Sequence, residues 1–138
     1  MAPVFVLDSS ALLAFLYGER GREQVQELLL KATLSRVSLR LHRLHLGEVY
    51  YVFYRKGGAR VAETMLGDVG QLPVVVEDRV SPALMREAGR IKASYRVSYA
   101  DAFAVGLARI RKGTLVSADR HEFTPVESAE EVAVNWIR

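Results

Sequence analysis

The chain contains no cysteine among its 138 residues. Disulfide frameworks and thiolate metal sites are therefore excluded, because both are built from cysteine sulfur atoms. Long apolar runs are also missing, and no segment approaches the ~18 consecutive apolar residues that a membrane span needs. The first apolar run ends at Asp8, too early for the apolar region of a signal peptide. We therefore expect a cytoplasmic protein without a membrane partner.

Glycine-rich phosphate-binding motifs are missing as well. Neither G-x-x-x-x-G-K-[ST] nor G-x-G-x-x-G occurs, so P-loop nucleotide hydrolysis and dinucleotide redox chemistry lose their main sequence support. The excess of positive over negative charge is small, because 19 basic and 16 acidic side chains give a net charge of +3. Such a charge would suit a polyanionic partner without identifying one. The basic side chains that flank Glu48 are those of Arg36, Arg40, His42, Arg43, His45, Arg55, Lys56 and Arg60. If Glu48 belongs to a cation site, these basic side chains would border a bound phosphate backbone. Otherwise they form a solvated surface.

The size and composition of the chain suit one domain over residues 1–138, half of them hydrophobic. Short β-branched runs predict strands near residues 3–7, 37–41, 72–76, 114–116 and 132–137. Helical apolar spacing predicts helices over 11–17, 22–34, 46–56, a further stretch to about 69, 82–94 and 99–111. Ser9 and Ser10 are expected to cap the first helix, and Gly57-Gly58 to end the third. Strands that alternate with helices imply an α/β fold with a mainly parallel sheet covered on both faces.

Four carboxylates stand where apolar runs stop, at Asp8, Glu48, Asp101 and Asp119. An ionised carboxylate in such surroundings must be paired, hydrogen-bonded or bound to a metal. In parallel sheets, sites lie at the carboxyl ends of strands, which is where Asp8 and Asp119 are expected. Carboxylate oxygens that converge there would bind a hard divalent cation such as Mg²⁺ or Mn²⁺.

Each acid also has a purely structural interpretation. Asp8 can cap a helix, Glu48 lies in the first turn of a predicted helix where acids are favoured, and Asp119 can stabilise a turn. Asp101 is different, because Ala104, Val105 and Ala108 follow it on the same helix face. An acid at the head of an apolar stripe points into the protein, which favours a functional role for Asp101.

Four fragments in this order carry a family resemblance: residues 6–12, residues 46–51, residues 99–104, and residues 115–119 followed by Phe123. The chain resembles the PIN-domain ribonucleases and, within them, the VapC-type toxins, over essentially its whole length. The resemblance implies a three-layer α/β/α PIN-like domain and a metal site made by Asp8, Glu48, Asp101 and Asp119. It also implies substrate contacts by the hydroxyls of Ser9 and Ser117, a homodimer, and a cognate antitoxin as partner.

One segment departs from that family. Its relatives commonly have small or hydroxyl residues where this chain has Leu41-His42-Arg43-Leu44-His45-Leu46. His42 and His45 together with Glu48 would make a zinc-like ligand set if the helix began early, although solvated histidines are the more common occurrence. His121 would approach a phosphate or lie in a surface loop.

We predict that the chain is a Mg²⁺- or Mn²⁺-dependent endoribonuclease and the toxin of a VapBC-type toxin–antitoxin pair. Asp8 and Asp101 would bind the ion most directly, and Glu48 and Asp119 would complete its shell. Arg43 and Arg55 are expected to contact RNA phosphates, and the aromatic run over residues 50–54 suits a protein interface. The alternatives are a non-catalytic PIN-like RNA-binding module and a metal-dependent phosphatase with Asp8 as nucleophile. The phosphatase is the weaker alternative, because Ser10 stands where its pattern needs a second Asp.

Overall fold

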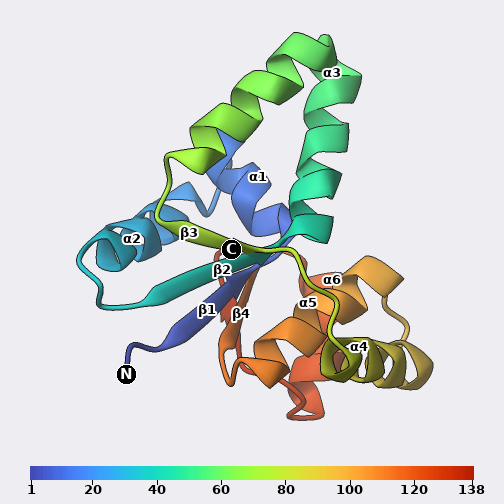
Figure 1. The fold of residues 1–138 in the computed structure, drawn as a ribbon. Helices are drawn as coiled ribbons and strands as arrows, with labels where there is room; N and C mark the ends of the chain where they lie inside the picture. Colours follow the sequence, from blue (N-terminus) through green and yellow to red (C-terminus); the bar gives the residue numbers. More distant parts are fainter.

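A computed structural model describes residues 1–138 and contains one sheet of five parallel strands in the order β3-β2-β1-β4-β5 (Figure 1). The strands are β1 (Val4–Leu7), β2 (Ser38–His42), β3 (Val74–Glu77), β4 (Thr114–Ser117) and β5 (Val134–Trp136). All five lie within or next to the predicted runs, and the prediction of a mainly parallel sheet is confirmed. The chain builds β1 to β3 in one direction and then crosses to β4 on the other side of β1. The carboxyl ends of β1 and β4 therefore form the switch point at which open α/β sheets bind ligands.

Six helices cover the sheet in two layers (Figure 1). The helices are α1 (Ser9–Tyr17), α2 (Arg22–Thr33), α3 (Arg43–Gly70), α4 (Pro82–Ser94), α5 (Tyr99–Ile110) and α6 (Arg120–Ser128). Helices α1 to α3 lie on one face of the sheet and α4 to α6 on the other. This is the expected three-layer α/β/α arrangement.

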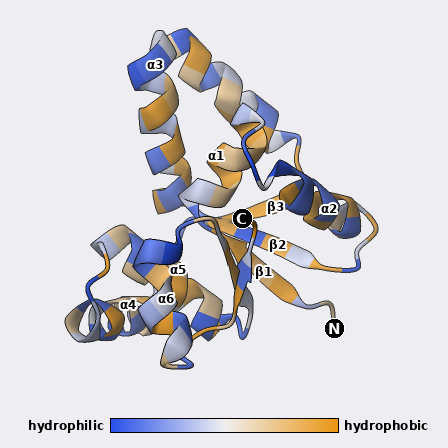
Figure 2. Cartoon of the chain, turned by 180° about the vertical axis from the view of Figure 1, so that it is seen from behind, coloured by the Kyte–Doolittle hydropathy of each residue, from blue (hydrophilic) through white to orange (hydrophobic).

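The protein has two hydrophobic cores, one on each face of the sheet, and successive residues of the central strands pack into different ones. In β1, Val6 packs with α4, α5 and α6, whereas Leu7 packs with α1, α2 and α3. In β4, Leu115 and Val116 divide in the same way. This follows from the strand period of two, which sends successive side chains to opposite faces of the sheet. Figure 2 shows the resulting hydrophobic colouring along β1 and β3, with hydrophilic segments on the helices around them.

Helix α3 is two arms joined at a sharp bend (Figure 1). The bend is at Gly58, whose φ of 83° and ψ of −175° are not helical. A side chain would be strained at this positive φ, so glycine is required there. The predicted helix end at Gly57-Gly58 is thus confirmed as a break in the helix, after which the second arm returns toward β3.

Three details differ from the sequence-based expectations. Helix α3 begins at Arg43 and not near residue 46, so Glu48 lies in its second turn and the prediction of a first-turn position was wrong. Helix α1 begins at Ser9 with Asp8 as its N-cap, because the Asp8 carboxylate accepts a hydrogen bond from the Ala11 amide. The prediction of Ser9 and Ser10 as the cap was wrong, since both residues lie inside the first turn. Helix α6 was not predicted, because it is short and contains Pro125. None of the helices combines the length and apolar character required to cross a membrane.

Candidate metal centre

The ends of β1 and β4 bring the first two groups of the site together. Leu7 pairs with Val116 across the two parallel strands, so the next residues, Asp8 and Ser117, leave the sheet side by side. The Asp8 amide donates to the Val116 carbonyl at 3.2 Å and continues the ladder by one residue. Asp119 follows two residues later as the N-cap of α6. The position of both acids thus follows from the strand register.

Asp8 forms the floor of the site and is only 2 % exposed. Its Oδ1 accepts hydrogen bonds from the Ser10 hydroxyl at 2.7 Å and the Ala11 amide at 2.9 Å. Its Oδ2 accepts a hydrogen bond from the Ser117 hydroxyl at 2.6 Å. Burial raises the pKa of Asp8, although these hydrogen bonds favour the ionised form.

Two serine hydroxyls tie the first turn of α1 to the end of β4. The Ser10 and Ser117 oxygens lie 3.3 Å apart, and the Ala118 amide donates to the Ser10 oxygen at 3.0 Å. The Asp119 amide donates to the Ser117 oxygen at 2.9 Å. Of the two hydroxyls expected in the site, that of Ser117 lies beside Asp8. The other hydroxyl beside Asp8 is that of Ser10, whereas Ser9 makes no side-chain hydrogen bond to the acids.

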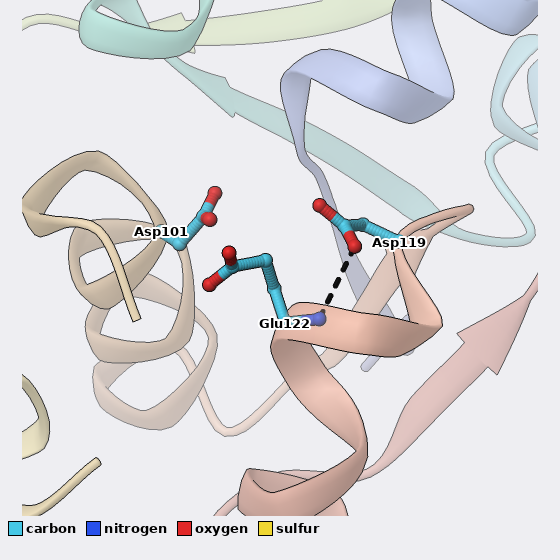
Figure 3. A group of neighbouring side chains, drawn as sticks. All are labelled: Asp101, Asp119 and Glu122. Carbon is cyan, nitrogen blue, oxygen red and sulfur yellow. Dashed lines mark hydrogen bonds between the residues drawn. The ribbon is translucent and has the colours of Figure 1, made fainter. Parts of the chain in front are cut away.

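Three other acids face one another from α5 and α6 (Figure 3). Each of Asp101, Asp119 and Glu122 offers a carboxylate oxygen, and these oxygens lie within 4.8 Å of one another. Asp119 Oδ1 accepts a hydrogen bond from the Glu122 amide at 3.2 Å, and the Asp101 amide donates to the Ser98 hydroxyl at 3.0 Å. Helix capping thus fixes both acids: Asp119 is itself the N-cap of α6, and Asp101 is held by the N-cap Ser98 of α5.

Glu122 was missed in the sequence, because α6 itself was not predicted. A signal was present, since Asp119 and Glu122 have the spacing of a capping box with Asp as the cap. Asp101 and Asp119 belong to the predicted quartet, and the structure joins them with Glu122. The other two members, Asp8 and Glu48, lie beside this group and contribute negative charge to Asp101.

The electrostatics of the site favour the approach of a positive charge. Burial and, to a smaller extent, the charges of Asp8, Glu122 and Glu48 together raise the pKa of Asp101 to about 7, although the hydrogen bond with Ser98 opposes the shift. One buried oxygen of Glu48, Oε1, and one of Glu122, Oε2, have no hydrogen-bond partner. Buried polar atoms without partners are rare in folded proteins. Oxygen donors in this state fit a hard divalent cation and its waters.

The zinc alternative does not fit the two buried histidines. His42 accepts a hydrogen bond from the Leu44 amide through Nδ1 at 3.1 Å and donates to the Arg79 carbonyl through Nε2 at 3.0 Å. Both ring nitrogens are therefore occupied, and His42 has no atom left for a metal. His45 donates from Nε2 to the Ala100 carbonyl at 2.8 Å. His121 is exposed at the start of α6.

The predicted phosphate-binding bases differ in their surroundings. Arg43, at the start of α3, forms an exposed ion pair with Asp78 at 2.5 Å. Arg55 donates to the Tyr51 hydroxyl at 3.3 Å and lies seven residues after Glu48. Seven residues are about two helical turns, so Arg55 shares a face of α3 with Glu48 at roughly 10 Å along the axis.

The aromatic run on the first arm of α3 spreads over more than one face, as its spacing predicted. Tyr51 and Tyr54 are 60 % and 51 % exposed. Phe53 is stacked on Tyr17 with ring centroids 4.8 Å apart, and Tyr50 lies against Tyr54 at 5.9 Å. Two tyrosines therefore remain available to a partner.

The sequence pattern of the PIN domain family matches residues 5–127. No curated protein sequence matches the chain. Among solved structures, DNA-bound VapBC from Salmonella typhimurium contains a chain that matches with a TM-score of 0.72 and 18 % identity over 100 % of both chains. VapC20 from Mycobacterium tuberculosis, named as a sarcin–ricin loop cleaving toxin, matches with a TM-score of 0.67 and 20 % identity over 88 % of this chain and 94 % of its own. VapBC2 from Rickettsia felis matches with a TM-score of 0.72 and 12 % identity over 96 % and 97 %. At these identities the likeness establishes the fold.

Proposed function

Since the chain belongs to the PIN-domain family, we propose that it is a Mg²⁺- or Mn²⁺-dependent endoribonuclease and the toxin of a VapBC-type pair. The observation that carries this proposal is the group of acids at the carboxyl ends of β1 and β4. Asp101, Asp119 and Glu122 bring their oxygens within 4.8 Å of one another, and no Lys or Arg forms an ion pair with any of them. Such a site needs a cation from solution.

The residues have distinct tasks in this proposal. Asp101, Asp119 and Glu122 would hold the ion through their facing oxygens. Asp8 would offer the lone pair of Oδ2 that Ser117 leaves free, and Glu48 its unpartnered Oε1. The serine hydroxyls of the floor fix Asp8, so that its carboxylate cannot turn away from the site.

When bound, such an ion lowers the pKa of a coordinated water and offsets charge that develops on the phosphate. A carboxylate such as Asp119 or Glu48 would orient the attacking water and accept its proton. The water oxygen bonds to phosphorus as the bond from phosphorus to the ribose 3′-oxygen breaks, and that oxygen takes up a proton. The products are a 5′-phosphate and a 3′-hydroxyl.

The proposal includes three partners. Arg43 and Arg55 would contact RNA phosphates on either side of Glu48. A cognate antitoxin is proposed because the solved structures of this fold include toxin–antitoxin complexes. A homodimer or an antitoxin contact is proposed at the exposed Tyr51 and Tyr54.

Geometry disfavours the phosphatase alternative. A nucleophilic Asp8 would need an accessible oxygen, but Asp8 is 2 % exposed and both oxygens accept hydrogen bonds. A non-catalytic RNA-binding module remains the alternative against which the proposal is tested.

RNA cleavage by the purified protein is the direct test. We expect cleavage with Mn²⁺ or Mg²⁺, loss of cleavage with chelator, and loss of at least about a hundredfold in Asp119→Asn, since even residues that only support metal ligands contribute 10- to 100-fold. The exposed acid Glu23 lies at the start of α2, so Glu23→Gln is a matched control that should retain full cleavage. RNA binding without cleavage by the parent protein would favour the non-catalytic module.

A further inference from the structure

We propose that His45 is a positioning residue that joins the first turn of α5 to the first turns of α3 and thereby sets how Asp101 faces Glu48. The inference rests on the proposed function, because it assigns a task toward the proposed metal site. It concerns the segment in which this chain departs from the family that it resembles.

The key contact is the 2.8 Å hydrogen bond between His45 Nε2 and the Ala100 carbonyl. A carbonyl oxygen only accepts, so Nε2 must carry the hydrogen and donate. Ala100 directly precedes Asp101, and His45 lies three residues before Glu48 on α3. The His45 imidazole therefore contacts the residue next to Asp101 and lies about one helical turn from Glu48.

No other hydrogen bond joins α3 to α5, whether from side chains or from the backbone. The two helices belong to different layers, and each is anchored in its own core. The relative placement of their N-terminal turns thus depends on the few groups that meet between them. Among these groups, His45 makes the one directional contact.

The surroundings of His45 hold the ring in place. Its side chain is 0 % exposed, and its ring meets that of His42 edge to face at 6.3 Å. His42 lies 6.3 Å from Phe103 of α5, whose ring contacts Tyr99 at 4.9 Å. This aromatic row runs from the start of α3 to the first turn of α5. A packed ring of this kind keeps its rotamer, which a positioning residue requires.

His45 is neutral in these surroundings. Burial lowers the pKa of His45, while the Ala100 hydrogen bond and the charges of Glu48 and Asp8 oppose the shift and His42 adds to it. The neutral ring with its hydrogen on Nε2 can donate to the Ala100 carbonyl. Its Nδ1 has no partner in the protein.

Three variants separate positioning from simple packing. His45→Phe keeps a buried ring but removes the donor. His45→Gln places an amide nitrogen the same number of bonds from the backbone as Nε2 and should restore the bond. His42→Phe is the control. It removes the donor to the Arg79 carbonyl, outside α5, and the acceptor of the Leu44 amide at the start of α3, but it keeps a ring against His45 and Phe103 and leaves the Ala100 bond in place.

Amide hydrogen exchange in chelator-treated protein tests the contact without any metal. The reporters are the Asp101 amide, which donates to the Ser98 hydroxyl, and the Ala102 amide, which donates to the Ser98 carbonyl. In His45→Phe we expect both to exchange about fivefold faster relative to the Leu107 amide, the fold-change of one typical net hydrogen bond. His45→Gln and His42→Phe should leave that ratio at the parent value.

Calorimetric titration with Mn²⁺ tests the consequence for the site. We expect about tenfold weaker Mn²⁺ binding in His45→Phe and recovery in His45→Gln, since groups that orient metal ligands contribute 10- to 100-fold in affinity. Parent-like exchange in His45→Phe, or Mn²⁺ binding unchanged by it, would overturn the inference while the proposed function stands. A parent protein that binds no Mn²⁺ would contradict the proposed function, and the exchange ratio would still decide whether His45 holds α5.

Discussion

Two acidic groups in this protein have opposite surroundings. Glu131 accepts hydrogen bonds from Arg90 at 2.9 Å and from the Tyr95 hydroxyl, and Arg109 also pairs with it. These partners, Arg90 first, lower the pKa of Glu131 to about 2. At the carboxyl ends of β1 and β4, by contrast, Asp101 is partly buried and has other acids as neighbours, and burial first and these charges second raise its pKa to about 7.

The difference separates a cluster that is paired within the chain from the cluster that we propose binds a cation. In the Glu131 cluster, which also contains Glu87, arginines from α4 and α5 supply the counter-charge, so the cluster is complete within the chain. In the Asp101 cluster, no arginine or lysine pairs with the acids, and one oxygen each of Glu122 and the neighbouring Glu48 has no hydrogen-bond partner. Acids matched by arginine stabilise a fold, whereas acids left unmatched prepare a site for an external cation.

The largest effect is expected when the chain supplies its own cation. Glu122→Arg places a guanidinium beside Asp101 and Asp119, which should replace the metal and lower Mn²⁺ affinity by more than about a hundredfold. Glu122→Gln, which removes a charge without adding the opposite one, should cost much less. Calorimetric titration of both variants measures the difference. Equal Mn²⁺ binding by Glu122→Arg and the parent would show that these acids are not the binding group.

A smaller effect is expected in the arginine-matched cluster. Glu131→Gln should lower the free energy of unfolding at pH 7 by about 1 kcal/mol, because the network is partly exposed and solvent screens it. The pKa of Glu131 is lowered in the folded state, so its contribution is complete above about 4.5 and is lost as the pH falls toward about 2. Urea unfolding at pH 7 and pH 2 checks this. If Glu131→Gln lowered the free energy of unfolding by the same amount at pH 7 and pH 2, the ion-pair explanation would be contradicted.

Removal of the Asp101 charge should have the opposite effect on stability. Its pKa is raised in the folded state, so ionisation of Asp101 destabilises the chelator-treated protein as the pH rises from about 4 to about 7. Asp101→Asn should therefore raise the melting temperature at pH 8 by roughly 3 °C, for a solvent-discounted ~1 kcal/mol, and change it little at pH 4. Thermal melts at the two pH values decide. Destabilisation by Asp101→Asn at pH 8 would contradict the cost of an ionised Asp101 that is partly buried among other acids.

The smallest effect is expected among the exposed bases. Arg55→Glu should weaken RNA binding and flatten its log-log salt dependence by ~0.7 for each phosphate of a single strand that the variant no longer neutralises. Arg43 is already paired with Asp78, so Arg43→Glu should change the slope less. RNA titrations at several salt concentrations compare the two. Slopes equal to the parent slope in both variants would mean that the RNA runs elsewhere.

Much of this arrangement was predictable because it follows from local pattern. Short β-branched runs and helical spacing predicted the five strands and most helices. The rule that sites form at the carboxyl ends of parallel strands directed attention to Asp8 and Asp119 from the sequence alone. The glycine pair at the bend of α3 was recognisable because few other residues adopt a positive φ.

The rest depended on contacts that sequence spacing does not encode. Glu122 was missed because Pro125 hides α6 from a helical pattern. Whether Ser9 or Ser10 lies beside Asp8 depends on the residue at which α1 begins. Asp8 caps the helix one residue earlier than expected, and this directs the Ser10 hydroxyl to Asp8. The partner of His45 is 55 residues away at Ala100, and nothing local to either residue indicates that pairing.

Mn²⁺ titration of the parent protein between pH 5.5 and 8 tests most directly whether the unmatched acids bind a divalent cation. Asp101 holds a proton below about pH 7, and the ion must displace it. We predict saturable binding whose affinity rises up to about tenfold per pH unit below pH 7 and levels off above, with proton uptake by the buffer. Absence of binding, or an affinity independent of pH over this range, would contradict it.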